Sequence, residues 1–456
     1  MRTEKVDVLI IGAGLTGLTA AYYLKKYGKT VKVIEKNKAI GGVIQTHRED
    51  DFVFESGPNT GVLSTPEAAE LLQEVKELCT PEIADETAKR RWVWKGKSWK
   101  ELPSGLMVGI TTPLFTVKDK FRILAEPFRK RGKNPDETLD HLVRRRMGKS
   151  FLEYAVDPFI LGIYAGDPSY LVPRYALPKL YNLEQDYGSF IGGAIKKSKE
   201  PKTANEKKAT KDVFSVKGGL DNLTDALAQK TGKKKIVLGN EHLRVAKTAG
   251  GYLAHYDGDK VEASHVVFTG GSHALHGIFD FIAEDDIKKV DNLLYAKVVQ
   301  VALGFRQWNG RPLNAFGGLV PFREQRDVLG VLLPSAFLKN RAPQGGAMLS
   351  VFLGGVRRPH EAEKSDEELL EMTGKEVKFM MQMPDFNPDL VRIFRYRHAI
   401  PQYGKTSGER LKKITELEKK NPGLTLAGNM KDGIGMADRI KQGRQVAEKI
   451  NGESTE

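Results

Sequence analysis

The hydrophobic pattern at the start of the chain changes its period twice within a short distance. A mainly apolar run, residues 6–11, is typical of a buried strand, and residues 15–27 carry apolar positions at helical spacing. A second apolar run at residues 30–34 indicates another strand. A strand, a helix and a strand in this order form a βαβ unit, which predicts a parallel sheet in an α/β fold.

The rest of the chain continues this mixture of strand and helix patterns. The predicted elements are a strand at 52–55, a helix at 66–78, a hairpin around Lys95-Gly96-Lys97, helices within 117–159, a strand–turn–helix at 213–228, and strands within 297–400 around one helix at 361–381. Residues 196–211 have no apolar periodicity and predict a mobile surface loop. The sequence shows neither repeats nor heptads.

The turn between the first strand and the first helix has the pattern G-x-G-x-x-G, formed by Gly12, Gly14 and Gly17. Such a turn lets a pyrophosphate approach the backbone, and the helix N-terminus behind it favours negative charge. Glu35 ends the second predicted strand, 23 residues after Gly12, where its carboxylate can accept hydrogen bonds from a ribose. This spacing of strand, helix and acid predicts a dinucleotide site.

A second glycine-rich helix start lies near the other end of the chain, in the segment LAGNMKDGIGMADRIKQG at residues 426–443. Gly433 and Gly435 permit close backbone approach, and the helix that follows directs its first N–H groups toward the turn. A flavin ring extends far from the turn that binds the adenine half of FAD, and a helix N-terminus stabilises the charge that reduced flavin develops near N1 and O2. We therefore expect both ends of the chain to bind one flavin.

Composition adds a question about surface charge. The 456 residues suffice for two or three domains, and the net charge of +14 is unevenly distributed. Residues 89–133 hold 13 Lys and Arg against 3 Asp and Glu, and they include the apolar run 106–115. Anionic lipid, nucleic acid and a merely solvated face each explain such a segment. Because no nucleic-acid motif accompanies it, lipid is the favoured partner.

The same composition suggests a cellular location. No apolar stretch is long enough to predict a membrane-spanning helix. Cys79 is the single cysteine, so no disulfide can form within the chain, and no signal peptide precedes the first strand. We expect a cytoplasmic protein that associates peripherally with the inner face of the membrane.

Several segments together resemble the family of oxygen-dependent protoporphyrinogen oxidases, and the resemblance extends over nearly the whole chain. The segments are FESGPNT at 54–60, RRWVWKGKSWKELPSG at 90–105, RRRMGKSFLEYAVDPFILGIYAGDP at 144–168, FSVKGGLDNL at 214–223, IPQYGKTSGERL at 400–411 and AGNMKDGIGMADRI at 427–440. Gly41-Gly42, close after Glu35, is also similar to a glycine pair in large amine-oxidase-type flavoproteins, which favours FAD.

The resemblance implies a Rossmann-type FAD-binding domain, interrupted by a strand-rich substrate-binding domain and a mostly helical, basic, membrane-associated insertion. The expected bounds are 1–60, 212–275 and 421–456 for the FAD-binding domain, 61–90 and 276–420 for the substrate-binding domain, and 91–211 for the insertion.

It also implies the oxidation of protoporphyrinogen IX to protoporphyrin IX in heme biosynthesis, with non-covalent FAD, three O2 consumed and three H2O2 released. Coproporphyrinogen III, which has four propionates rather than two, is the alternative substrate. The expected partners are the porphyrinogen, O2, an anionic membrane surface and the next enzyme of the heme pathway, with no nucleic acid. We name no catalytic base and no metal site.

Individual residues follow from the same resemblance. Arg91 corresponds to an arginine that pairs with a substrate propionate, and Asn59 is a second substrate contact. The residues expected to enclose the macrocycle are Phe316, Gly317, Leu319, Leu332 and Phe352. The expected cofactor-binding residues are Gly12, Ala13, Gly14, Leu15, Thr16, Gly17, Glu35, Lys36, Gly42, Val43, Gly57, Pro58, Asn59, Thr60, His242, Gly435, Met436 and Ala437. Without the resemblance, Arg91 would equally suit a solvated basic cluster and the apolar positions a plain core.

Two departures and three alternatives accompany the resemblance. Ala39 stands where family members often carry Arg, and Asn59 stands where some relatives do. A flavin amine oxidase is an alternative, although it would be expected to have aromatic residues near the C-terminal motif, where this chain has Met430 and Met436. A carotenoid desaturase would lack GIYAGDP. A non-catalytic protein of the Rab GDP-dissociation inhibitor type would bind no flavin.

Overall fold

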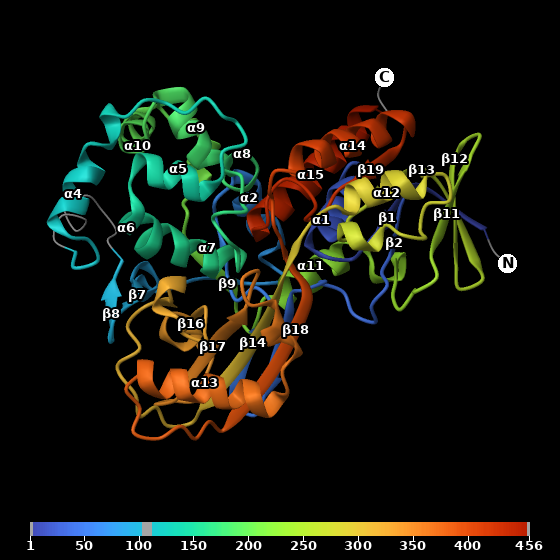
Figure 1. Ribbon diagram of the computed structural model, residues 1–456. Helices are drawn as coiled ribbons and strands as arrows, with labels where there is room; N and C mark the ends of the chain where they lie inside the picture. Colours follow the sequence, from blue (N-terminus) through green and yellow to red (C-terminus); the bar gives the residue numbers. More distant parts are fainter. Residues whose placement is uncertain (1–2, 103–111, 454–456) are drawn as a thin grey trace.

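Two seven-stranded sheets organise the molecule (Figure 1). The computed structural model describes residues 3–102 and 112–453. Helices cover the first sheet, and a separate helical region lies against the second sheet on the side away from α13 (Asp366–Met380). The prediction of an α/β fold with a parallel sheet at its start is confirmed.

The first sheet is built around the expected βαβ unit. Its order is β10-β2-β1-β13-β12-β11, and β19 pairs with β13. The strands are β1 (Thr3–Ile11), β2 (Val31–Ile34), β10 (Ile236–Val237), β11 (Arg244–Thr248), β12 (Gly251–Tyr256), β13 (Asp259–Phe268) and β19 (Leu424–Leu426). Ile11 is in register with Ile34 and with Phe268, which in turn pairs with Leu426. The carboxyl ends of these parallel strands therefore meet at one edge, where α/β sheets bind ligands.

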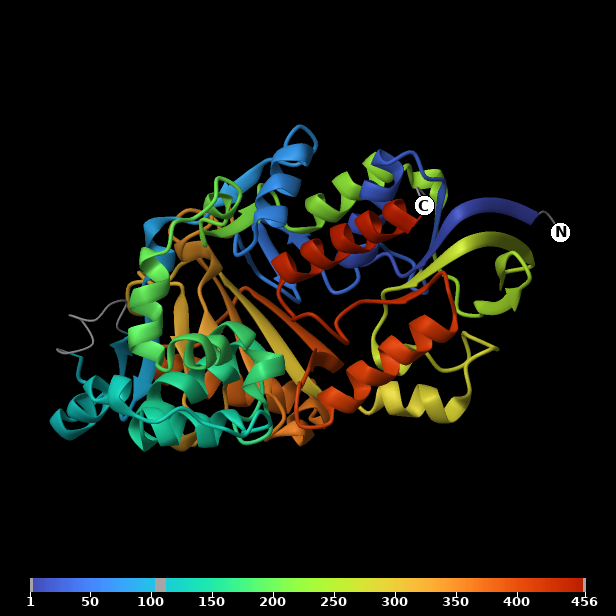
Figure 2. The ribbon, with the colours of Figure 1, turned by 90° about the horizontal axis from the view of Figure 1, so that it is seen from above.

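Alternate residues of β1 enter two different cores. Val8 and Ile10 pack under α1 (Leu15–Lys26), α2 (Pro66–Val75), α11 (Asp221–Thr231) and α15 (Met436–Glu453). Leu9 and Ile11 enter the core that contains α12 (Glu284–Asp291) and α14 (Ser407–Lys420). Figure 2 shows α15, in red, beside α1. Gly443 allows this approach, because a Cβ there would lie 2.6 Å from the Thr16 carbonyl oxygen.

The second sheet has the order β18-β14-β17-β16-β15-β7-β8. Its strands are β7 (Arg91–Lys95), β8 (Ser98–Glu101), β14 (Tyr295–Phe305), β15 (Gly317–Leu319), β16 (Gly330–Leu332), β17 (Ala347–Gly354) and β18 (Leu390–Pro401). Trp92, Trp94 and Trp99 pack with the apolar side of α13 on one face of this sheet. Two small sheets complete the strands, the hairpin β3 (Gln45–Glu49) with β4 (Phe52–Ser56), and β5 (Gly61–Val62) with β9 (Val213–Val216) and β6 (Pro81–Ile83).

The helical region is held by a buried ion network. Its helices are α4 (Val117–Leu124), α5 (Leu139–Arg146), α6 (Lys149–Phe151), α7 (Asp157–Tyr164), α8 (Pro173–Ala176), α9 (Pro178–Tyr187) and α10 (Phe190–Lys199), with one π-helical turn at 152–156. Arg146, fully buried, pairs with Glu126 and Glu184, and Glu126 also accepts hydrogen bonds from Ser189 Oγ and the Phe190 amide. Burial raises the pKa of Glu126, but these donors bring it below its usual value.

Some predicted boundaries differ from the structure. Strands β5 and β6 of residues 61–83, expected in the substrate-binding domain, pair with β9, and Leu63, Leu71 and Leu72 share the core of the first sheet. Residues 91–101, expected in the helical insertion, are strands of the second sheet, since β7 pairs with β15. The first residues of the predicted loop 196–211 belong to α10, which Ser189 caps.

The described residues contain no helix that is both long and apolar enough to cross a membrane. The Pro-Ser-Gly part of the 90–105 segment and most of the apolar run 106–115 lie outside the described residues. Membrane association of the insertion therefore stays a prediction.

Candidate active site

The glycine turn before α1 sits at the carboxyl edge of the first sheet. A Cβ on Gly17 would overlap the Gly12 carbonyl oxygen, so packing within the turn itself excludes a side chain there. A Cβ on Gly14, in contrast, would meet no protein atom within 4 Å. Gly14 thus faces open space at the start of a helix whose N-terminus has no side-chain cap. Free N–H groups and open space are what a pyrophosphate requires.

Glu35 holds this turn from the side. Its Oε2 accepts a hydrogen bond from the Ala13 amide at 2.7 Å, and its Oε1 accepts one from the Asn37 amide at 2.8 Å. Each carboxylate oxygen has a second lone pair, so Glu35 can still accept bonds from a ribose. The neighbouring Asn240 side chain is buried, and neither of its polar atoms has a partner among the described residues. These orphaned groups suit the sugar and base of a nucleotide.

The loop between β19 and α15 is fixed by three side chains that the sequence analysis did not identify. Arg439 donates from Nη2 to the carbonyl oxygens of residues 431–433, at 2.9 to 3.0 Å. Gln442 Oε1 accepts from the Gly428 amide at 2.8 Å. The Tyr403 hydroxyl lies 2.7 Å from the Asn429 carbonyl oxygen and 2.9 Å from that of Gly433. The loop is thus held rigidly beside the glycine turn, because α15 packs on α1.

The turn after β4 joins the first sheet to the second. The Gly57 amide donates to Gln300 Oε1 at 3.0 Å, and Gln300 Nε2 donates to the Glu55 carbonyl oxygen at 2.6 Å. Ser350 Oγ donates to Asn59 Oδ1 at 2.9 Å. Gln300 and Ser350 are isolated polar residues within buried strands, which is a sequence signal that could have identified them. The side chain of Asn59, predicted as a substrate contact, is buried in this joint.

Strand register places most predicted substrate residues on one face of the second sheet. Gly317 is paired with Arg91 and Leu332, and Leu332 with Ser350. We call this the inner face: one row holds Arg91, Gly317, Leu332 and Ser350, and the next holds Val93, Leu319, Gly330, Phe352 and Gln300. It is the face that contacts the Gly57–Asn59 turn and is opposite to the tryptophan core. Phe316 immediately precedes β15 and stacks on Phe337, with ring centroids 4.8 Å apart.

Helix α7 lies along part of the inner face. Leu161 packs in one cluster with Val298 and Leu329. A Cβ on Gly162 would overlap Leu319, so the helix approaches the sheet closely there. Phe159 and Ile163 are one helical turn apart on α7. They are 41% and 43% exposed, so they form a small exposed apolar surface beside the sheet. Helix α7 therefore adds apolar surface next to the inner face.

Arg91 has no ion-pair partner within the described residues. Its side chain is exposed, yet surrounding protein atoms partly desolvate the guanidinium and lower its pKa. Both properties are expected of a group that lines an open cleft, where water reaches it and protein surrounds it. The guanidinium lies over the Phe316 ring, whose centroid is 5.3 Å from the guanidinium carbon. Arg91 is thus available to an anion.

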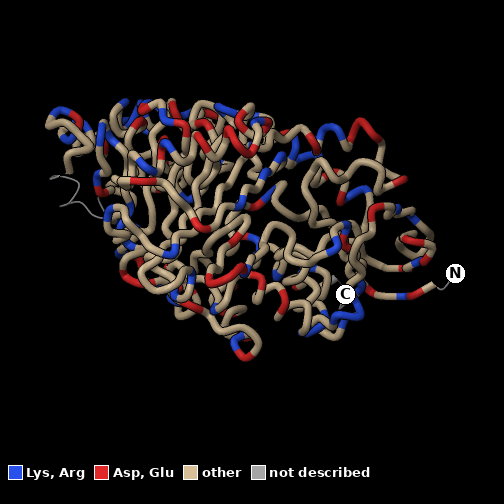
Figure 3. The backbone as a smooth tube through the Cα atoms, turned by 90° about the horizontal axis from the view of Figure 1, so that it is seen from below, with Lys and Arg blue, Asp and Glu red and all other residues tan. Residues whose placement is uncertain are grey.

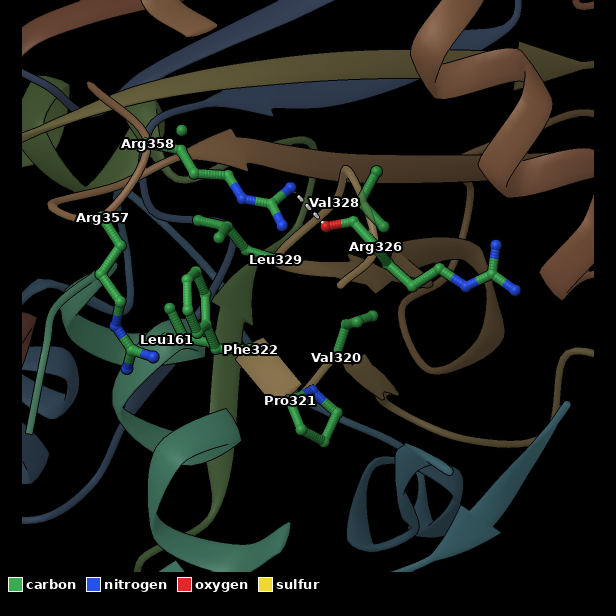
Figure 4. Close-up of a pocket in the computed structure, with 10 residues that line it drawn as sticks. Leu161, Val320, Pro321, Phe322, Arg326, Val328, Leu329, Arg357 and Arg358 are labelled. Atoms are coloured by element: carbon green, nitrogen blue, oxygen red, sulfur yellow. Dashed lines mark hydrogen bonds between the residues drawn. The ribbon is translucent and has the colours of Figure 1, made fainter. Parts of the chain in front are cut away.

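Figure 4 shows a small cavity between α7 and the second sheet, lined in part by Leu161 and Leu329. The Phe322 amide donates to Asp157 at 2.9 Å, Arg357 pairs with the same carboxylate, and the Arg357 guanidinium carbon lies 4.4 Å from the Phe322 ring centroid. None of the predicted substrate residues lines this cavity. It is a gap at the joint between α7 and the second sheet, not the expected site.

Residues 15–451 match the family described as flavin containing amine oxidoreductase. The chain belongs to this family. Membership implies a flavin cofactor, and the open space at Gly14, the orphaned Asn240 and the fixed loop before α15 fit one.

Two curated proteins that are similar to this chain are named as porphyrinogen oxidases. Protoporphyrinogen oxidase 2 of Arabidopsis thaliana is 27% identical, over 97% of this chain and 93% of the relative. Coproporphyrinogen III oxidase of Bacillus subtilis (strain 168) is 26% identical, over 97% of both chains. The resemblance to the protoporphyrinogen oxidase family is thereby confirmed.

Solved structures confirm the fold of this family member. A protein from Exiguobacterium sp. 255-15, assigned provisionally as a protoporphyrinogen oxidase, has a TM-score of 0.82 at 21% identity, over 99% of this chain and 100% of that one. Cyclohexylamine oxidase from Brevibacterium oxydans IH-35A has a TM-score of 0.72 at 15% identity, with the same coverage. At such identities the likeness establishes the fold alone.

The remaining predicted residues of this flavoprotein-family chain lie around the same edge of the first sheet. Gly42 packs closely against the glycine turn, since a Cβ at this position would lie 3.3 Å from Gly14 Cα. Met436 and Ala437 are buried at the start of α15. His242 follows Asn240, whose amide donates to the Glu35 carbonyl oxygen. Leu15, Thr16, Lys36, Val43, Pro58, Thr60 and Gly435 lie in these same turns and helix starts, and their contacts with a cofactor stay predictions.

Proposed function

We propose that the protein oxidises protoporphyrinogen IX to protoporphyrin IX in heme biosynthesis, with FAD as electron acceptor and O2 as the final oxidant. Six hydrogens leave the substrate in three two-electron steps, and three O2 become three H2O2. The names of the relatives support a porphyrinogen as the substrate class. The observation that carries the proposal is the unpaired Arg91 guanidinium beside the apolar residues of the inner face.

The roles of the chain's own residues in this reaction are binding and orientation. Arg91 would hold a propionate, while Leu319, Leu332 and Phe352 would contact the flat face of the macrocycle. Gln300 and Ser350 on the inner face bind Gly57 and Asn59, and these hydrogen bonds would fix the distance between the inner face and the turn after β4, where cofactor contacts are predicted. Because a conjugated ring forms as hydride leaves, we assign no residue as a catalytic base.

FAD is expected to be bound non-covalently. Residues 426–443 contain neither His nor Cys that could attach the flavin. Precipitation of the yellow protein with acid should therefore leave the flavin in the supernatant, whereas flavin in the pellet would contradict non-covalent binding.

We favour protoporphyrinogen IX over coproporphyrinogen III because, of the two arginines in the Arg91 row, only Arg91 lacks an ion pair among the described residues. Ala302 pairs with both Ser350 and Arg392, so Arg392 belongs to the Arg91 row. Arg392, however, donates to both carboxylate oxygens of Glu49 through its Nε and Nη2 groups, so its charge already has an ion-pair partner. One free guanidinium suits a substrate with two propionates better than one with four.

We also propose peripheral association with an anionic membrane through α4 and the turn after it. Val117, Phe121 and Leu124 are 68%, 69% and 45% exposed and share one helical face, and Phe128 is 90% exposed. Lys118, Lys120 and Arg122 lie among them. Figure 3 shows basic residues gathered at this end of the molecule. An exposed apolar face flanked by cations is typical of an interfacial helix.

Anaerobic mixing with each porphyrinogen tests the proposed reaction. Loss of flavin absorbance is expected within the turnover time with protoporphyrinogen IX and more slowly with coproporphyrinogen III. The reverse order would favour the coproporphyrinogen assignment. If neither porphyrinogen reduces the flavin, both substrate assignments are refuted, and an amine becomes the next substrate to test.

A further inference from the structure

Arg410, on the first turn of α14, is a buried cation without a counter-ion. Its side chain is 1% exposed. Nη2 makes one long hydrogen bond, 3.3 Å to Ser407 Oγ, and neither Nε nor Nη1 has an acceptor among the described residues. Within the same part of the chain no carboxylate forms an ion pair with it. Two other buried arginines, Arg146 and Arg341, each contact carboxylates.

The groups around Arg410 are phenols rather than acids. Tyr403 presents its ring to the guanidinium, with 5.7 Å between the guanidinium carbon and the ring centroid. Tyr295, Tyr170 and Tyr175 are also close enough to interact with the charge electrostatically. Burial lowers the pKa of Arg410, and these phenols only partly oppose that effect. Phenol rings stabilise a cation weakly, so the charge is left largely uncompensated within the protein.

The same phenols touch the loop that precedes α15. The Tyr403 hydroxyl binds the carbonyl oxygens of Asn429 and Gly433, and the Tyr295 hydroxyl donates to Asn429 Oδ1 at 3.2 Å. Arg439 holds the loop from its other side, and it too has no carboxylate partner among the described residues. The loop is therefore flanked by two buried positive charges. Of these, Arg410 makes no hydrogen bond to the loop and can act on it only through its charge.

We propose that Arg410 supplies a permanent positive charge that raises the reduction potential of the flavin held by this loop. Two-electron reduction adds negative charge to the flavin ring, and one proton compensates only part of it. A buried cation behind the loop stabilises the reduced form relative to the oxidised form, because the low-dielectric surroundings screen it little. A high potential suits removal of hydride from a carbon. The proposal rests on flavin binding and not on which porphyrinogen is the substrate.

The test is an anaerobic spectroelectrochemical titration of the holoprotein with mediator dyes. Arg410→Met, which removes the charge but keeps an unbranched side chain, is expected to lower the two-electron potential by about 30 mV, a tenfold change in the reduction equilibrium. Arg410→Lys should keep most of the wild-type potential. If the Met variant is insoluble, Arg410→Gln removes the same charge.

Arg444→Met is the matched control. Arg444 lies on α15 with its side chain 26% exposed beside Glu70 and Glu448, so water screens the charges there and the loss of this arginine should leave the potential nearly unchanged. A Met variant with the wild-type potential, or Lys and Met variants with equal shifts, would overturn the proposal.

Stability separates this role from a structural one. Replacing an uncompensated buried charge by Met should leave the thermal midpoint unchanged or raise it. A lower midpoint with an unchanged potential would make Arg410 a packing residue. Because the dyes replace the substrate, the titration can succeed even if neither porphyrinogen reduces the flavin. A purified protein without flavin would overturn both proposals.

Discussion

Replacing Arg91 by Ala is the sharpest test of how substrate is held. The residue is exposed and its guanidinium has no ion-pair partner among the described residues, so its removal breaks no ion pair there. The lost contact with Phe316 contributes about 0.5–1 kcal/mol at an exposed site. The variant should therefore fold and keep its flavin. Any large effect must then come from the substrate.

The expected loss follows from the bond to the propionate. A hydrogen bond to a charged group contributes roughly 1.5–3 kcal/mol, which corresponds to about a tenfold to hundredfold decrease in kcat/KM. The loss should appear in KM if Arg91 holds ground state and transition state equally, and in kcat as well if it also sets the distance to the flavin. Arg91→Lys keeps the charge but not the two-pronged geometry, so it should recover part of the activity.

Steady-state kinetics with protoporphyrinogen IX, together with the flavin absorbance of each variant, measures both effects. Arg90 is the matched control, because it is the neighbouring residue, is exposed and points away from the inner face by strand alternation. Arg90→Ala should change kcat/KM little. Equal and mild effects of the two Ala variants would refute the proposed substrate orientation.

Three further predictions concern the cofactor, the fold and the membrane. Gly14→Ala should keep the thermal midpoint but weaken FAD binding, measured by fluorescence titration, whereas Gly17→Ala should destabilise the fold itself, because only Gly17 lacks space within the protein. Arg146→Met should lower the free energy of unfolding by roughly 3–5 kcal/mol in urea, since it leaves the buried Glu126 carboxylate without its ion-pair partner. Phe121→Ser should reduce co-sedimentation with anionic vesicles, because it removes apolar surface from the exposed face of α4.

Each of these has an outcome that contradicts it. Equal effects of the two glycine variants on stability would show that the space at Gly14 is not reserved for a ligand. An Arg146→Met protein as stable as wild type would mean that the ion network does not hold the helical region. Binding of wild type to neutral vesicles as strongly as to anionic ones would remove the electrostatic part of the membrane proposal, and no binding to either would remove all of it.

Local signals in the sequence were enough for the first βαβ unit and for the two glycine-rich helix starts. Strand, turn and helix each depend on residues close together in the chain, so period and glycine spacing predicted α1 and β2 to within one residue and the end of β1, which begins three residues earlier than predicted. The hairpin β7–β8 around Gly96 was equally predictable from its alternation. The prediction of a loop was wrong for residues 196–199, which belong to α10. Their composition is typical of a loop, but the helix starts earlier, after its N-cap Ser189.

Only the tertiary structure decided which segments share a domain and which side chains share a face. Apolar residues in 61–83 suit either sheet, and their packing with Val8 and Ile10 of β1 assigned them to the core of the first. Register set by distant strands put Arg91 in a row with Gly317 and Leu332, more than 200 residues away. Arg410 and Arg439 look like ordinary helical arginines in the sequence. Their burial without counter-ions depends on Tyr403 and the loop before α15, which come together only when the chain has folded.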